Sequence, residues 1–175
     1  MKRLSFPVAA AVTLFLLGGC VPTQTPVGST ISPTPEAEFV GTWQVKGDDT
    51  KLDVVVKDAA AGHIIATEQG EEDAEPTHLF FRTVGDQLII NWKAKEKLYA
   101  WVLAEKSDDK IVCYLPNHKT FKRLVDEGVL KKPAEKSDAP VASISDEMLK
   151  EILEGKHGED MFVKEKPLVY ERVKK

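Results

Sequence analysis

The sequence predicts a mainly β domain, an antiparallel meander that closes into a barrel or a half-barrel, with two short helices before the last strand. Short apolar, β-branched runs recur about every 8 to 12 residues with turn residues between them. Gly85-Asp86 separates two such runs by a pair of turn residues, which is the sharpest hairpin signal in the chain. Two apolar patterns with helical spacing fall close together in the C-terminal third.

The expected strands begin after residue 38 and are separated by short polar turns. They cover residues 39–46, 52–57, 63–69, 78–84, 87–93, 98–105, 110–115 and 168–173. Consecutive strands joined by short turns pair with their neighbours in antiparallel fashion. This regular spacing is typical of a barrel or a sandwich.

Both expected helices carry start and stop signals. Residues 118–127 follow Asn117, and residues 146–154 follow Ser145; both residue types favour the helix N-cap. A glycine comes directly after each range, where it can end the helix. Each range has apolar residues at helical spacing, so we expect both helices to bury one face.

The first twenty residues have the three parts of a secretory signal. Lys2 and Arg3 form a short positive region, and residues 8–17 form an apolar run of about ten residues. A helix that spans a bilayer needs about 20 residues. The run therefore favours a signal segment, residues 1–19, over a permanent transmembrane helix.

Leu17, Gly18, Gly19 and Cys20 close this segment, and they resemble the lipobox of bacterial lipoproteins. The resemblance implies a diacylglyceryl group on the Cys20 thiol, cleavage before Cys20 and acylation of the new amino terminus. It places the protein in the cell envelope. Because Val21 and not aspartate follows Cys20, it implies the periplasmic face of the outer membrane in a Gram-negative cell.

Residues 20–38 are expected to be a solvated linker that follows the lipidated cysteine, because prolines recur among Thr, Ser and Gly. Residues 39–175 are expected to form a single domain. Of the 24 Lys and Arg residues, two lie in the signal segment, so 22 face 28 acidic residues and the mature net charge is about −6. This balance argues against nucleic acid as a partner.

Gly41-Thr42-Trp43 opens the first strand and resembles the G-x-W signature that begins lipocalin barrels. The resemblance implies a lipocalin-like barrel in which Trp43 plugs one end and a late arginine, here Arg172, stacks across it. With Gly41-Thr42-Trp43, its aromatic strands, and Tyr114-Leu115-Pro116 leading into Phe121 to Gly128, the chain from residue 39 onward also looks like a group of bacterial lipoproteins without an assigned activity. It lacks the T-D-Y motif of lipocalins and divides its late helical segment in two.

No motif for catalysis, metal binding or a cofactor stands out. The four histidines lack ligand spacing, and no nucleophile motif is present, so the sequence predicts a protein that is not an enzyme and needs no cofactor. Cys113 lies in an apolar run and is expected to be a buried, inert thiol. A barrel face with Tyr99, Trp101 and Trp92 could bind an apolar ligand, and packing of these rings under a helix is the favoured alternative.

These observations lead to two functional hypotheses. The first is a non-enzymatic lipoprotein, anchored to the membrane through Cys20, whose domain binds an envelope protein or another envelope component. The alternative is a lipocalin-like carrier of a small apolar ligand. A packed or a hollow barrel interior would discriminate between them.

Overall fold

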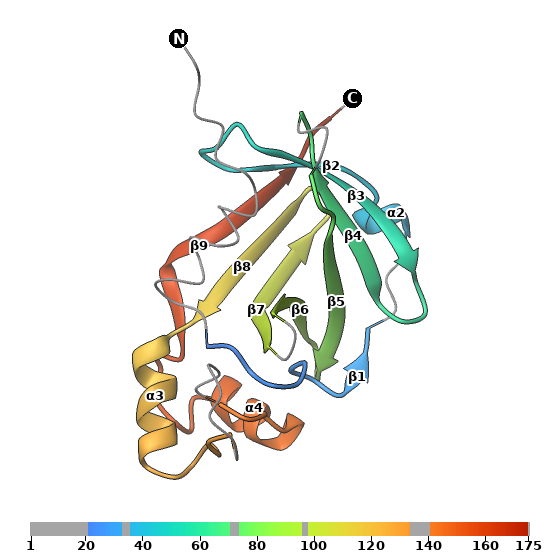
Figure 1. Cartoon of the computed structure of the whole chain (residues 1–175). Coiled ribbons are helices and arrows are strands. Elements are labelled where there is room, and N and C mark those ends of the chain that lie inside the picture. The colour runs from blue at the N-terminus through green and yellow to red at the C-terminus, as the bar shows by residue number, and fades with distance from the viewer. Residues whose placement is uncertain (1–20, 33–35, 71–73, 96–97, 134–140, 175) are drawn as a thin grey trace.

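The fold is an eight-stranded antiparallel barrel with one extra strand and three helices, seen in a computed structural model (Figure 1) that describes residues 21–32, 36–70, 74–95, 98–133 and 141–174. Each barrel strand pairs with the next in the sequence, and the last pairs with the first. The barrel strands are β2 Gly41–Val45, β3 Lys51–Asp58, β4 His63–Glu68, β5 Thr77–Val84, β6 Gln87–Lys95, β7 Leu98–Ser107, β8 Lys110–Pro116 and β9 Phe162–Arg172. The closed up-and-down order confirms the predicted lipocalin-like barrel.

Both late helices begin where the sequence predicts them. In α3, His118–Asp126, the Asn117 side chain accepts a hydrogen bond from the backbone N–H of Lys119 at 3.1 Å. In α4, Asp146–Leu153, the Ser145 side chain accepts one from the N–H of Met148 at 3.2 Å. A shorter helix, α2 Glu36–Phe39, precedes the barrel.

Strand β9 begins at Phe162, six residues earlier than expected. Its pairing with β8 is irregular, because Leu168 lies opposite Cys113 whereas Val163 lies opposite Leu115. The extra residues on β9 include Pro167, which cannot donate a backbone hydrogen bond. Because of the charged run 164–166 and this proline, the first half of the strand lacks the apolar alternation from which strands are predicted.

The buried apolar residues that the structure describes form two hydrophobic cores, one on each side of the barrel wall. On β7, Val102 and Ala104 belong to the core inside the barrel, whereas Trp101 and Leu103 belong to a second core outside it. This follows from the alternation of side chains along a strand. The outer core is completed by α3 and α4, which lie together on one side of the barrel (Figure 1).

Residues 21–32, which we call the N-terminal strap, are not the solvated linker that the sequence predicts. Val21 and Val27 are 1% and 0% exposed, and both belong to the outer core. The strap ends in β1, Thr30–Ile31, which pairs with β5 beyond the residues that pair with β4. In Figure 1 it passes between the barrel strands and α4.

Specific hydrogen bonds hold the strap in this place. The Asn91 side chain, which is 0% exposed, donates to the carbonyl of Val27 at 3.0 Å and accepts from its N–H at 2.7 Å. Thr23 exchanges two backbone hydrogen bonds with Tyr99, at 2.8 and 2.9 Å. Through these bonds and the burial of Val21 and Val27, the strap is part of the outer core.

Candidate functional site

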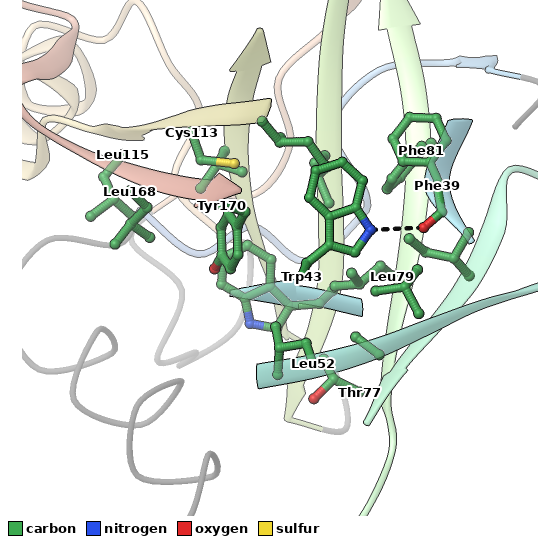
Figure 2. A pocket seen from close by; sticks show the side chains of 17 residues that line it. Phe39, Trp43, Leu52, Thr77, Leu79, Phe81, Cys113, Leu115, Leu168 and Tyr170 are labelled. Atoms are coloured by element: carbon green, nitrogen blue, oxygen red, sulfur yellow. Dashed lines mark hydrogen bonds between the residues drawn. The ribbon is translucent and has the colours of Figure 1, made fainter. Parts of the chain in front are cut away.

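The interior of the barrel contains a cavity of about 140 Å³ (Figure 2). Its wall combines residues from α2 and from all eight barrel strands, and nearly all of them are apolar. The aromatic members are Phe39, Trp43, Phe81, Trp92 and Tyr170. The barrel is therefore partly hollow and not fully packed.

One end of the cavity is closed by aromatic packing. The Phe39 ring lies edge-on to the Phe81 ring with centroids 4.7 Å apart. Trp43, which is 2% exposed, donates from Nε1 to the carbonyl of Phe39 at 2.9 Å. The α2 helix is thus fixed to the first barrel strand at this end.

The predicted pair of Trp43 and Arg172 is brought together here. The two residues lie opposite each other on β2 and β9, and the guanidinium carbon is 4.5 Å from the centroid of the indole ring. Arg172 also donates to the carbonyl of Val40 at 2.7 Å and to that of Glu38. Its position matches the role that the lipocalin resemblance implies.

The other predicted aromatic residues are divided between the two sides of the wall. Trp92 lines the cavity, as the ligand hypothesis expects. Trp101 packs outside the barrel against Phe121 of α3, and its Nε1 donates to the carbonyl of Val21 at 2.9 Å. Tyr99 forms backbone hydrogen bonds with Thr23 of the strap, and neither Tyr99 nor Trp101 is among the described residues that line the cavity.

Several cavity residues were not singled out as ligand-binding from the sequence. Cys113 is the buried thiol that the sequence predicts, and it also lines the cavity; burial raises its pKa to about 12, so the thiol stays protonated at neutral pH. Burial also raises the pKa of Tyr170 above its ordinary value. Thr77 lies on the inner side of β5 with Leu79. Alternate residues of a strand face the same side, so counting in steps of two from a residue assigned to the barrel interior could have identified all three.

Outside the cavity, His63 and His78 lie side by side on β4 and β5. Nε2 of His63 is 2.9 Å from Nδ1 of His78, and the rings stack. Burial, followed by the charges of His78 and Lys57, lowers the pKa of His63. Among the residues that the structure describes, no three His, Cys, Asp or Glu side chains gather in a way that could hold a metal ion.

Comparisons of the chain with protein-family models, with curated proteins and with solved structures give no match. The barrel is therefore established by the strand pairing itself. Membership in the lipocalins or in a lipoprotein family stays a prediction. In the described part of the chain, none of the helices has the length and apolar character needed to cross a membrane. Leu17, Gly18, Gly19 and Cys20 lie outside the described residues.

Proposed function

We propose that the protein is a lipid-anchored, non-enzymatic binding protein of the cell envelope that holds a small apolar ligand inside its barrel. The observation that carries the ligand-binding part is the cavity of about 140 Å³ with its aromatic and aliphatic wall. Folded proteins pack their interiors closely and leave few voids larger than a water molecule. A hollow of this size with an apolar lining is suited to an apolar guest.

The size of the cavity limits the ligand. An engineered apolar cavity of about 150 Å³ in another protein binds benzene and stays free of water when empty. A cavity of similar volume here fits a single ring or a short alkyl chain. A long-chain lipid exceeds this volume, so only part of its chain would lie inside the barrel.

The anchoring part of the proposal is supported by the sequence at Leu17, Gly18, Gly19 and Cys20. Two or more acyl chains on Cys20 would hold the domain stably on a bilayer, whereas one chain would bind only weakly. In a Gram-negative cell, Val21 in place of an aspartate after Cys20 would favour sorting of the protein to the outer membrane. Binding of an envelope protein to the barrel exterior, the other hypothesis from the sequence, stays a prediction.

A cavity-filling variant tests ligand binding. Ala66 lines the cavity on β4, and we expect Ala66→Leu to weaken the binding of toluene, an apolar probe, by at least about tenfold because the side chain occupies the same space. Thr67→Leu is the matched control: it adds bulk at the next residue, which points to the other side of the strand. Binding can be followed by NMR shifts of cavity residues in the purified protein.

Native mass spectrometry of the same protein, purified from cells, would reveal a ligand that stays bound. The proposal is wrong if toluene does not bind to the wild type. It is also wrong if Ala66→Leu binds toluene as tightly as Thr67→Leu does.

A further inference from the structure

Two histidines on the outer face of the barrel form a pair that the proposed function does not use. Nε2 of His63 and Nδ1 of His78 are 2.9 Å apart, and the ring planes differ by 28°. Both side chains point away from the cavity, because the residues that directly follow them in the chain, Ile64 and Leu79, line it. One of the two facing nitrogens carries a proton and the other accepts it. A metal ion that both nitrogens can bind is an alternative to this shared proton.

The pairing of β4 with β5 brings the two rings together, although 15 residues separate them in the sequence. His63 lies opposite Phe80, and His78 lies opposite Ile65, so the two histidines are diagonal neighbours on the same face. Diagonal neighbours on paired strands are within reach of each other when their side chains are long or aromatic. The backbone of a closed barrel therefore fixes the distance between the two rings.

The surroundings of His63 orient its ring and keep it neutral. The ring stacks on that of Phe80, with centroids 4.8 Å apart and an angle of 17° between the planes. Burial is the main cause that lowers the pKa of His63; the charges of His78 and Lys57 lower it further, and that of Asp58 opposes them. A lowered pKa leaves the imidazole uncharged at pH 7, and this is the form that binds a metal ion.

The distance between the two nitrogens indicates which metal geometry fits. With metal–nitrogen bonds of about 2.0 to 2.1 Å, two ligands at a right angle lie about 2.9 Å apart, whereas two tetrahedral ligands lie about 3.4 Å apart. The observed distance between Nε2 of His63 and Nδ1 of His78 is 2.9 Å, which matches the right angle. Right angles between nitrogen ligands are typical of Cu²⁺ and Ni²⁺, and Cu²⁺ binds a given site more tightly than the other divalent ions of the first row.

The pair supplies two ligands to such an ion, and water completes the coordination. In the part of the chain that the structure describes, no third His, Cys, Asp or Glu side chain joins the two rings. His78 is exposed, so its ring can turn about its side-chain torsions until the Nδ1 lone pair points at the ion. An ion held by two imidazoles and water at the barrel surface would exchange with solvent.

We propose that His63 and His78 form a surface site for one Cu²⁺ ion, bound through Nε2 of His63 and Nδ1 of His78. This inference goes beyond the proposed function, because the site lies outside the barrel and requires no guest in the cavity. Strand pairing assembles it, so the spacing of histidines in the sequence does not reveal it.

Titration of the purified protein, without a histidine tag, with Cu²⁺ tests the inference. Because Cu²⁺ is paramagnetic, one equivalent should broaden the NMR signals of β4 and β5 around His63 and His78, and the EPR spectrum should show two coordinated nitrogens. His78→Gln changes an exposed position and should weaken Cu²⁺ binding at this place by at least about tenfold, because one of the two protein ligands is lost. His63→Gln should weaken it to a similar extent.

His118→Gln is the matched control, since it removes an exposed histidine on α3. This variant should leave the broadening at β4 and β5 and the affinity there unchanged. Absence of broadening around the pair with one equivalent of Cu²⁺ would overturn the inference. So would Cu²⁺ binding at this place that is equally tight in the wild type and in His78→Gln. Neither result bears on the binding of toluene in the cavity, so the two proposals fail separately.

Discussion

Arg172 connects the end of the last barrel strand to the beginning of the first. Its guanidinium stacks on Trp43 and donates to backbone carbonyls at Val40 and Glu38, so one side chain fixes the path from α2 into β2. Gly41 makes this approach possible. A Cβ atom at Gly41, whose φ is +136°, would come within 3.2 Å of an Arg172 nitrogen.

Replacement of Arg172 by alanine should lower the free energy of unfolding by about 2 kcal/mol, because the cation–π contact and two hydrogen bonds are lost together. Arg172→Lys should lose about half as much, since it keeps the charge but not the forked donors. Denaturant unfolding measures both. Lys174→Ala is the control: its side chain is 82% exposed, so its loss should cost less than about 0.5 kcal/mol. Equal stability of Arg172→Ala and Lys174→Ala would contradict the role of Arg172.

At the scale of elements, the sequence predicts the barrel strands and both late helices because each carries its own local signals. The alternation of residues and the turns define the strands, and caps define α3 and α4. The strap was missed because its partners are distant: Asn91 is 64 residues from Val27, and Trp101 is 80 residues from Val21. The composition of a segment indicates its local conformational preference, but it does not show which distant residues the segment packs against.

The candidate site was predicted in part for a similar reason. Trp43 and Trp92 line the cavity and Arg172 stacks on Trp43, but Tyr99 and Trp101 lie on the outer side of β7. Alternation shows that Trp101 and Val102 face opposite ways, but it does not show which of them faces inward. Both faces of β7 are apolar, because α3 and α4 cover the outer one.

Asn91→Ala tests whether the strap is an integral element. The variant would leave both the N–H and the C=O of Val27 buried without their partner, and we expect a loss of about 2 to 4 kcal/mol in the free energy of unfolding. Ser29→Ala removes a strap bond to Asp146 at an exposed site and should cost less than about 1 kcal/mol. Thermal and denaturant unfolding would compare the two. If Asn91→Ala is no less stable than Ser29→Ala, the hydrogen bonds between Asn91 and Val27 do not hold the strap in place.

For the whole molecule, the buried strap changes what a lipid on Cys20 would do. Val21 is 1% exposed and its carbonyl is bound to Trp101, so a buried residue of the outer core directly follows the proposed lipid attachment. Consecutive Cα atoms are only about 3.8 Å apart. An anchor at Cys20 would then hold the barrel against the lipid headgroups with the face of the outer core nearest the bilayer. The opposite wall is β3, which lies four strands from β7 around the ring.

This orientation can be measured by energy transfer from a donor dye on the lipidated protein to an acceptor in the headgroups of vesicles. A donor at Lys119→Cys, on exposed α3, should transfer more strongly than one at Val55→Cys, which is 51% exposed on β3. A Gly/Ser spacer of about 20 residues between Cys20 and Val21 has a mean reach of about 25 Å and should remove most of the difference. Equal energy transfer from both donors without the spacer would contradict the orientation in which the outer core lies nearest the bilayer. Cys20→Ala protein that still sediments with the vesicles would contradict the anchor itself.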